Sequence, residues 1–447
     1  MQAAEADVNI YVAEMRFFRA LEYFNKIQLL GDVPWLEVDL NVDSEELYGP
    51  KMKRNQVFQK IIEDLDFAIQ WLPEAGSEEA NRLNKDIARH VKARFCLNEG
   101  THYKYHNELE YASEAEKWLQ MAATESDKLI TSGRYEIYNT GHPQEDYFNM
   151  YRIDDKSDLK EAVLYVDYKT NIREHNMAAA GREAGCGFSK SFVESFLCSD
   201  GLPISLSNKY LGDETMRKET ANRDPRLKQL ILTNDFPTNV TDDLKDSTFV
   251  VNEDEFITQH CFTGYRPIKG FNPIYSQALY MKSSFDGIAY RYAETLLINA
   301  EAKAELNTIT DADLDRTINQ LRDRVGMPHL TVNVGFTDPK WPDWGYSLSP
   351  ILQEIRRERC IELAGEGFRF NDLKRWKAGK VLNNVLTYVG KRKPDGNLAI
   401  VYPNYTNPDL SYQAGKSRTW EDKMYLYPIP TGELQRNPQL LPQNPGW

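Results

Sequence analysis

Three aromatic side chains, a carboxylate and two turn-forming residues fall within one short segment of the chain. The segment reads Trp341-Pro342-Asp343-Trp344-Gly345-Tyr346 and lies outside any periodic hydrophobic pattern. Flat rings stack on the C–H face of a sugar, and carboxylate oxygens accept hydrogen bonds from its hydroxyl groups. Proline and glycine turns hold such rings in place, so little freedom is lost on binding. This segment therefore predicts carbohydrate binding through Trp341, Asp343, Trp344 and Tyr346.

Other residues in irregular parts of the chain are candidates for the same role. Trp35 directly follows a Gly-Asp-Val-Pro turn, and core packing is its favoured alternative. A further candidate group consists of Tyr265, Arg266, Phe271, Asn272 and Tyr275, and polar side chains at Asn171, Arg173, His175 and Asn176 add reach. For every ring the simpler interpretation is that it fills space between a loop and the helices.

Neighbouring acidic residues raise the possibility of glycoside cleavage, which requires two carboxylates flanking the bond. The adjacent acids Asp154-Asp155 and Asp242-Asp243 are explained more simply as solvated loop residues. The sequence contains no G-x-S-x-G, H-E-x-x-H or phosphate-loop motif. Its 5 cysteines lack C-x-x-C spacing, and only 7 histidines accompany them, so no zinc site is predicted, and no oxygen-rich loop of the EF-hand type indicates calcium. We expect a protein that is not an enzyme.

Residues 356–376 form a run that is unusually dense in arginine and glutamate for a core helix. On a helix, Leu352, Ile355, Arg359 and Leu363 share one face, so Arg359 points into the core. A buried guanidinium needs a carboxylate, and Glu362 and Glu366 are the nearest candidates. We expect a structural ion-pair group between this helix and the one that begins near residue 291. Its predicted members are Glu294, Glu301, Arg356, Arg357, Arg359, Glu362 and Glu366.

Four motifs in the expected order resemble the SusD/RagB family, whose members are nutrient-binding lipoproteins of the outer membrane of Bacteroidetes. One is a helix followed by the turn Gly31-Asp32-Val33-Pro34, and another is the charged run at 356–376. The other two are the segment Arg291–Ala302 and the ending from Leu426 to Gly446, with its repeated Asn-Pro pairs.

The resemblance implies a surface-exposed protein that binds an oligosaccharide and passes it to a SusC-like TonB-dependent transporter in the outer membrane. It also implies four tetratricopeptide-like helix pairs and no cofactor. Residues 1–7 contain no lipoprotein signal and no lipid-accepting cysteine, whereas family members usually carry a signal and a further leading segment. If such a segment is missing here, the helix at 7–30 should show an uncovered apolar stripe or be capped by another copy of the chain.

Helices must position the candidate site, because apolar residues recur at helical spacing along much of the chain. The predicted helices are 7–30, 54–72, 86–105, 113–131, 290–306, 311–325 and 349–365. Antiparallel pairs of such helices with alanine at close contacts indicate a tetratricopeptide-like stack. The predicted fold class is mostly α, with helix pairs and a loop-rich, minor-β insertion.

The middle of the chain has little periodicity and frequent prolines. A strand is predicted at 162–166, with strand-like pieces near 228–233 and 248–251. We therefore divide the sequence into a helical part at 1–133, a loop-rich insertion at 134–285 and a signature region at 286–447. The three parts are expected to form one compact unit.

Composition narrows the functional classes. The net charge of −13 argues against nucleic acid and anionic membrane surfaces as partners. Hydrophobic residues make up 41% of the 447 positions, which suffices for a core. Two alternatives to glycan capture remain: a helical-repeat scaffold that binds a peptide or protein partner in its concave face, and a glycan-cleaving enzyme.

Overall fold

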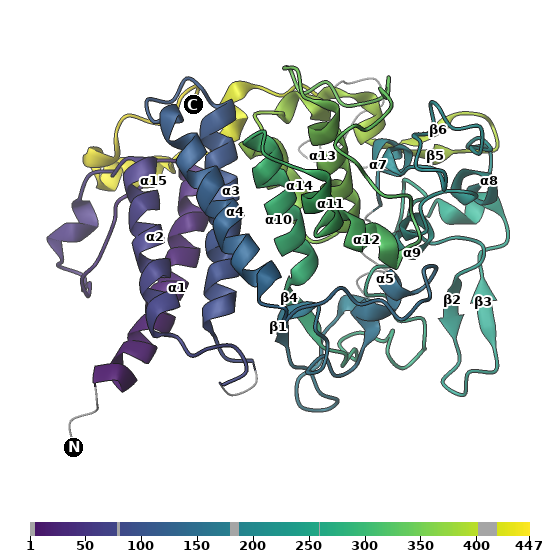
Figure 1. Ribbon diagram of the computed structural model, residues 1–447, viewed down its shortest axis with the longest axis horizontal. Helices are drawn as coiled ribbons and strands as arrows, with labels where there is room; N and C mark the ends of the chain where they lie inside the picture. Colours follow the sequence, from purple (N-terminus) through teal and green to yellow (C-terminus); the bar gives the residue numbers. More distant parts are fainter. Residues whose placement is uncertain (1–4, 78–80, 179–186, 259, 401–417) are drawn as a thin grey trace. The chain divides into compact units, whose positions relative to one another are not determined.

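The computed structural model describes residues 5–77, 81–178, 187–258, 260–400 and 418–447 (Figure 1). Helices dominate these residues and strands are few and short, which confirms the predicted fold class. The chain separates into two compact units. Unit 1 comprises residues 1–129, 374–379 and 420–447, and unit 2 comprises 130–373 and 380–419. The three-part division of the sequence stays a prediction.

Unit 1 is built on long helices that pack in chain order, α1 against α2 and α2 against α3. Its helices are α1 (Glu5–Leu30), α2 (Arg54–Trp71), α3 (Lys85–Tyr105) and α4 (Ala115–Thr131), with 3-10 turns η1 (Glu45–Tyr48) and η2 (Ala112–Glu114). Each α-helix begins and ends within two residues of its predicted range. The long apolar repeats explain this agreement, since tertiary packing of one face stabilises most protein helices.

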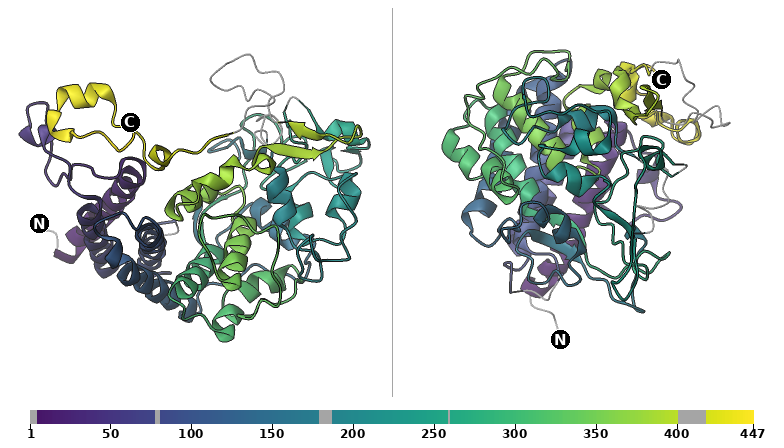
Figure 2. Two further views of the ribbon diagram at one scale, coloured as in Figure 1. Left: turned by 90° about the horizontal axis from the view of Figure 1, so that it is seen from above. Right: turned by 90° about the vertical axis from the view of Figure 1, so that its right-hand side faces the viewer.

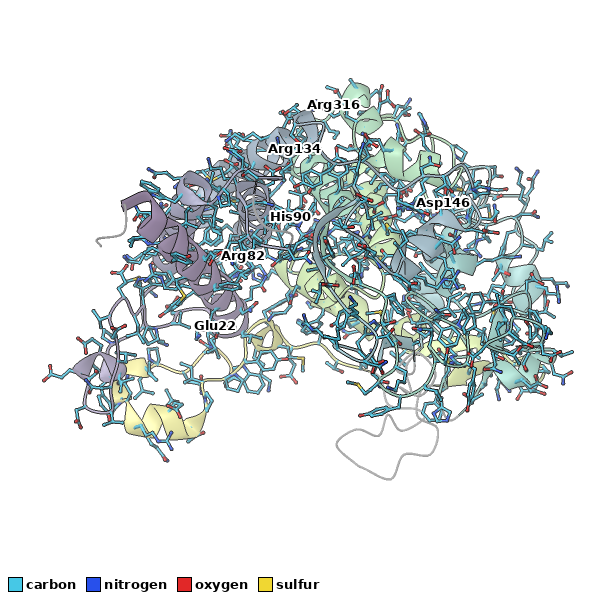
Figure 3. The ribbon with its side chains drawn as sticks, turned by 90° about the horizontal axis from the view of Figure 1, so that it is seen from below. Glu22, Arg82, His90, Arg134, Asp146 and Arg316 are labelled. Carbon is cyan, nitrogen blue, oxygen red and sulfur yellow. The ribbon has the colours of Figure 1, made fainter. Side chains whose placement is uncertain are left out.

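The core of unit 1 combines stacked rings with a buried ion pair. Phe24 of α1 lies flat on Phe95 of α3, with ring centroids 3.6 Å apart. The buried Arg54 guanidinium donates to Glu99 at 2.8 and 2.5 Å. At the surface, Arg82, labelled in Figure 3, reaches Glu14 of α1 at 2.6 Å. These contacts tie α1 and α2 to α3 and to the loop that precedes it.

One face of α1 is apolar and exposed. Val8, Tyr11, Met15 and Phe18 follow one another at spacings of three, four and three residues, and all four side chains are exposed. This spacing places them in one row along the helix. The exposed apolar stripe that the sequence analysis expected on this helix is therefore present.

The C-terminal residues belong to unit 1 and contribute η7 (Asp422–Tyr425), α15 (Thr431–Arg436) and η8 (Pro438–Leu440). The N–H of Tyr427 donates to the carbonyl of Leu29 at 2.8 Å, at the end of α1. Gly31 ends α1 with a φ of 77°, and a Cβ there would lie 3.1 Å from Leu426. A left-handed backbone and this close approach both favour glycine.

Unit 2 holds α10 (Tyr292–Glu305), α12 (Ile318–Arg324) and α13 (Pro350–Glu362) in contact with one another. Its other helices are α5 (Asp146–Asn149), α7 (Lys190–Ser195), α8 (Met216–Thr220), α9 (Arg226–Leu230), α11 (Asp311–Asp315), α14 (Phe368–Arg375, which continues into unit 1) and the 3-10 turns η3 (Met150–Arg152), η4 (Glu253–Phe256), η5 (Gly379–Asn383) and η6 (Val385–Thr387). The predicted helix 311–325 is interrupted between α11 and α12.

Strands in unit 2 form antiparallel pairs. The pairs are β1 (Ala162–Val166) with β4 (Gly287–Arg291), β2 (Pro237–Val240) with β3 (Ser247–Phe249), and β5 (Val389–Arg392) with β6 (Leu398–Ile400). The strand predicted near 228–233 is wrong, because these residues begin within the helical turn α9. Ion pairs of Arg226 fix that turn and override the β-propensity of the sequence.

An apolar core fills unit 2 beside these strands and includes Tyr147, Phe196, Leu227, Tyr265 and Ile361. Asp146, labelled in Figure 3, accepts hydrogen bonds from the N–H groups of Thr140 and His142 and so fixes the turn before α5. Within the described residues, no helix is both long enough and apolar enough to span a bilayer.

Candidate functional site

The first turns of α13 fasten the aromatic segment 341–346 in unit 2. Each of the three aromatic side chains shares a hydrogen bond with a different residue of this helix. The pairs are Trp341 Nε1 with Glu354 Oε1 at 2.7 Å, Trp344 Nε1 with Gln353 Oε1 at 2.6 Å, and Tyr346 Oη with Arg356 Nη1 at 3.0 Å. The rings thus have fixed positions, which suits them to binding a ligand with little loss of freedom.

The residues on either side of the segment are fixed as well. Ser349 caps α13 by accepting the N–H of Leu352, and Pro350 opens the helix. Arg357 Nη2 donates to Asp338 Oδ2 at 2.7 Å, and Arg357 Nη1 donates to the carbonyl of Ser195. Burial alone would raise the pKa of Asp338, but hydrogen bonds from Arg357, the N–H of Lys340 and Ser205, together with the charge of Arg357, lower that pKa below its usual value. The ionised pair therefore holds the start of the loop on the helix.

Three of the four candidate ligand-binding residues of the segment remain open to solvent in part. Trp341 and Tyr346 are half-buried, and Asp343 is exposed. Asp343 Oδ1 accepts the N–H of Gly345 at 2.9 Å, which orders the tip of the turn. The ring of Phe336 lies 6.1 Å from that of Trp341, so two aromatic rings adjoin at this surface. The carboxylate and the partly open rings could contact a sugar together.

Trp344 does not share this exposure. Its side chain is buried, and the guanidinium carbons of Arg356 and Arg369 lie 4.9 and 5.8 Å from its ring centroid. The prediction that Trp344 meets a ligand directly is thus corrected. Burial of the Trp344 ring attaches the segment to the protein. The faces of that ring are in contact with neighbouring side chains and are not open for a sugar to stack on.

Two residues of the group near 270 are also core residues. Tyr265 is fully buried, and its hydroxyl donates to Glu219 at 2.8 Å. Phe271 is buried, with the guanidinium of Arg266 5.5 Å from its ring centroid. The predicted ligand contact of Tyr265 and Phe271 is corrected, because both rings pack inside unit 2. Asn272 fixes a turn, since its Oδ1 accepts the N–H of Ile274.

Tyr275 lies on a second surface of unit 2, formed by residues 171–177 and 275–285. It is half exposed, and Tyr280 nearby along the chain is more exposed still. Two contacts join the segments: Asn176 Oδ1 accepts the N–H of Met281, and His175 exchanges backbone hydrogen bonds with Ser283. Exposed phenols beside amide groups could bind a sugar here too.

The remaining members of the polar set lie at the edge of this second surface. Asn171 is exposed and has a φ of 63°, and the guanidinium of Arg173 lies 4.9 Å from the ring centroid of Tyr168.

Trp35 belongs to unit 1 and is enclosed by its own chain. Its ring centroid lies 4.2 Å from that of Tyr23, and the cationic groups of Arg19 and Lys60 lie 5.0 and 5.6 Å from it. The side chain is half-buried. These neighbours occupy positions that a stacked sugar would take, which favours the packing alternative.

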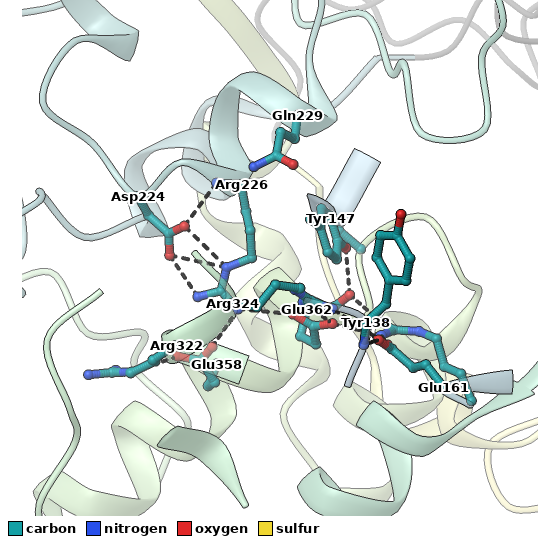
Figure 4. Close-up of polar contacts among 12 residues, drawn as sticks. Tyr138, Tyr147, Glu161, Asp224, Arg226, Gln229, Arg322, Arg324, Glu358 and Glu362 are labelled. Carbon is teal, nitrogen blue, oxygen red and sulfur yellow. Dashed lines mark hydrogen bonds and ion pairs between the residues drawn. The ribbon is translucent and has the colours of Figure 1, made fainter. Parts of the chain in front are cut away.

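A buried charge network holds the other end of α13 (Figure 4). The carboxylate of Glu362 lies at its centre and receives one guanidinium from each of three segments. The distances are 3.0 Å to Arg226, 2.6 Å to Arg291 and 2.7 Å to Arg324. Glu161 bridges Arg291 and Arg324 at 3.0 and 3.4 Å, and all five side chains are buried.

The network fixes its own charge state. Burial would raise the pKa of Glu362, but the guanidiniums of Arg324, Arg291 and Arg226 hold that pKa well below its usual range. Burial lowers the pKa of Lys269, which donates to Glu366 at 2.6 Å, to about 8. Such buried pairs define one arrangement of their elements, because a missing partner would leave an uncompensated charge.

Of the partners predicted for Arg359, Glu362 and Glu366 are wrong, whereas Glu301 of α10 lies within ion-pair distance. Arg359 Nε donates to Asp372 at 2.9 Å and lies 3.7 Å from Glu301, whereas Glu362 and Glu366 turn toward other cations. The four-residue face that includes Arg359 is nevertheless buried throughout. Arg356 lies 3.2 Å from Glu305, and Glu294 is buried within α10.

Several residues that build the site escaped the sequence analysis. Gln353 and Glu354 follow the aromatic segment closely, and this proximity could have indicated them. Arg226 and Arg324 carried no such signal, because they lie 136 and 38 residues from Glu362. Among the residues that the structure describes, no cluster of three or more His, Cys, Asp or Glu is placed to hold a metal ion.

Comparisons with known proteins agree on one family. Residues 124–447 match the SusD family. SusD-like protein P2 of Formosa agariphila is 24% identical over 456 residues, which cover 99% of this chain and 75% of that protein. SusD-like protein P25 of the same organism is also 24% identical, with 98% and 72% covered.

Solved structures show the same fold. A SusD-like protein from Bacteroides fragilis superposes with a TM-score of 0.74 at 24% identity and covers 100% of this chain and 81% of its own. A second structure from that species, described as a SusD-like carbohydrate-binding protein, has a TM-score of 0.72 at 22% identity, with 98% and 81% covered.

Proposed function

Because the chain belongs to the SusD family, we propose that it captures an oligosaccharide at the cell surface without cleaving it. The description of one structural relative as carbohydrate-binding supports this proposal. The captured glycan then passes to a SusC-like TonB-dependent transporter, and the protein acts as a surface-exposed lipoprotein of the outer membrane.

The observation that carries the proposal is the fastening of Trp341 to α13. The indole Nε1 is directed at Glu354 and is satisfied by it, so the polar edge of the ring is engaged within the protein. The rest of the half-buried ring, together with Asp343 and Tyr346, adjoins solvent. A sugar stacked on Trp341 would place its hydroxyl groups within reach of the Asp343 carboxylate and the Tyr346 hydroxyl.

The second surface extends the binding region in this proposal. Tyr275 and Tyr280 supply exposed rings, and Asn171, Arg173 and Asn176 supply polar groups, whereas both ring nitrogens of His175 are hydrogen-bonded within the protein. An oligosaccharide offers several sugar units, so more than one aromatic platform can contribute to its binding.

Replacement of Trp341 tests the proposal. Wild-type protein and the Trp341→Ala variant are compared by electrophoresis in gels that contain single polysaccharides, followed by calorimetry with the retained glycan. We expect the variant to lose about tenfold or more in affinity, because stacking area is removed. The matched control is Trp447→Ala, since Trp447 is half exposed and its Nε1 is also hydrogen-bonded, to Lys423 and Leu426.

Four outcomes would contradict the proposal. Retention of no carbohydrate by the wild type would remove its basis. Equal affinity in both variants would place the ligand elsewhere. Shorter sugars released by the wild type would show a glycan-cleaving enzyme. Retention of peptides in place of glycans would instead favour the helical-repeat scaffold.

A further inference from the structure

Residues 37–48 of unit 1, here called the acidic arm, leave large apolar side chains in water. The exposed fractions are 54% for Val38, 39% for Leu40, 87% for Val42, 42% for Leu47 and 50% for Tyr48. Soluble proteins rarely gather so many exposed apolar side chains in one short segment unless they mark an interaction site. The acidic arm is therefore a candidate docking surface.

The apolar residues of the acidic arm alternate with polar ones. From Glu37 to Asp43 the sequence reads Glu-Val-Asp-Leu-Asn-Val-Asp, outside any helix or strand. The backbone bends at Val38 and turns at Val42–Asp43, where the N–H of Ser44 donates to the carbonyl of Asn41, so apolar and acidic side chains are interspersed along one short exposed segment. A partner that contacts this segment meets exposed apolar groups with carboxylates beside them.

Both ends of the acidic arm are fixed within unit 1. The N–H of Leu36 donates to the hydroxyl of Tyr23 at 2.9 Å, just before the arm begins. At its other end, Gln439 Nε2 donates to the carbonyl of Tyr48 at 2.7 Å and Asn437 Nδ2 to that of Gly49 at 3.0 Å. Figure 2 shows this end beside the C-terminal residues around α15. Fixed ends reduce the ordering that binding must impose on the arm.

The charge of the acidic arm selects its partner. The arm contains Glu37, Asp39, Asp43, Glu45 and Glu46 and no lysine or arginine. Among the described residues, only Glu37 of these acids forms an ion pair, with Lys60 at 3.1 Å. Anionic membranes, nucleic acid and the same arm of a second copy would all be repelled. A cationic protein surface is the complementary partner.

We propose that the acidic arm docks into an apolar groove of a protein partner whose borders carry lysine and arginine. This inference rests on the proposed function, because the partner that it fits is the SusC-like transporter that receives the glycan. Val38, Leu40 and Val42 fill the groove, and the arm's carboxylates pair with the basic border. The glycan surface in unit 2 takes no part in this contact.

The test measures binding of the full chain to detergent-solubilised SusC-like transporters of the bacterium that makes it, immobilised on a biosensor. The wild type is compared with the triple variant Val38→Ser, Leu40→Ser, Val42→Ser. We expect the triple variant to bind about tenfold more weakly or worse. The matched control is Leu206→Ser, Leu211→Ser, Val251→Ser, which removes comparably exposed apolar residues of unit 2 and should bind within about twofold of the wild type.

A second variant addresses charge. Asp39→Asn, Asp43→Asn, Glu45→Gln and Glu46→Gln together keep the shape of the arm and remove its exposed carboxylates. We expect slower association at low ionic strength and a weaker dependence of the association rate on salt than in the wild type. Because all these positions are exposed, the thermal midpoints of the variants should equal that of the wild type.

Each result decides for or against the inference. If the triple variant binds a transporter as tightly as the wild type does, the acidic arm is not the docking surface. Glycan capture and delivery would not be affected by that result. Failure of the wild type to bind any of the transporters would overturn the arm and the delivery step together, with glycan retention still separately measurable. A dimer of the wild type that the triple variant abolishes would overturn the inference in favour of a second copy.

Discussion

The carboxylate of Glu362 receives three guanidinium groups from residues far apart in the sequence. Two of its neighbours, Arg291 and Arg324, also pair with Glu161. Each of these two arginines therefore has more than one carboxylate partner. In a dry interior, removal of one member leaves opposite charges uncompensated, and that penalty exceeds the net contribution of the intact pair.

Glu362→Gln should therefore destabilise the protein strongly. The variant retains the size of the side chain but leaves Arg226, Arg291 and Arg324 without their shared carboxylate, at a cost of about 3–5 kcal/mol. Urea denaturation monitored by circular dichroism would measure the change. Glu136→Gln is the control, because its exposed pair with Lys160 should contribute less than about 1 kcal/mol. Similar losses in both variants would refute the central role of Glu362.

For single residues, the sequence predicted which side chains are buried better than it predicted their ion-pair partners. Helical spacing placed Arg359 on the buried face of α13, and it is buried. Its partner Asp372 lies beyond the turn at Gly365 and Gly367, whose positive φ values redirect the chain. Local spacing could not show that turn, so its nearest candidates for Arg359, Glu362 and Glu366, were wrong, whereas the pairing with Glu301 expected across the helix interface is present.

A single helix, α13, performs two mechanical tasks along its length. Its first turns fasten the aromatic segment through Gln353, Glu354 and Arg356. Its last turns carry Glu358 and Glu362, which join the buried charge network. The charged signature therefore does more than identify the fold, since it also fixes the position from which the loop is presented.

Glu354→Ala should weaken glycan binding without altering any exposed group. Trp341 Nε1 would lose its acceptor, so its ring would no longer be held in one position, and we expect a loss of about tenfold in affinity. Calorimetry with the glycan retained by the wild type would measure it. Glu354→Gln should restore binding, because an amide oxygen also accepts a hydrogen bond. Failure of this rescue, or normal binding by the alanine variant, would contradict the role of Glu354.

Long periodic elements were predictable, and short ones were not. The ranges of α1 to α4, α10 and α13 could be predicted because apolar residues recur along them at helical spacing and most of these residues are buried. The turn α9 reads as a strand because its sequence offers too few residues for a period, and the ion pairs of Arg226 determine its conformation. Likewise, the composition of the aromatic segment showed its chemistry but not which ring would be buried.

Across the whole molecule, the two units differ in how they should respond to acid. In unit 1, the rings of His102 and His106 lie 4.1 Å apart at the end of α3, and Tyr425 meets His106 edge-on. Burial lowers the pKa of His106 to about 4 and that of His102 well below its ordinary value. In unit 2, the lowered pKa of Glu362 keeps the charge network ionised.

Unit 1 should thus lose stability first as the pH falls. Above an unfolded pKa of about 6.5 the histidines are neutral in both states and their contribution is fully present. Below it the unfolded chain binds protons that the folded chain rejects, so stability declines until the pH reaches the folded pKa near 4. At about pH 5 we expect a loss of about 1–2 kcal/mol from His106. The stabilisation from Glu362 persists above its unfolded pKa of about 4.5.

Hydrogen exchange at about pH 7 and about pH 5, corrected for intrinsic rates, would locate this effect. Protection should fall in α3 and residues 420–447 but not in α13. His106→Gln serves as the control, because it keeps a hydrogen-bonding side chain that does not titrate and should reduce the difference. Equal loss of protection in both units would contradict the prediction.

The fastening of the aromatic loop has a consequence for protein engineering. Its attachment points are Asp338, Trp341, Trp344 and Tyr346, whereas the tip residues Pro342, Asp343 and Gly345 carry none of the bonds to α13. Libraries that randomise only the tip residues would leave these attachments of the loop to α13 unchanged. One framework could then yield a series of lectin-like reagents, each selective for a different sugar.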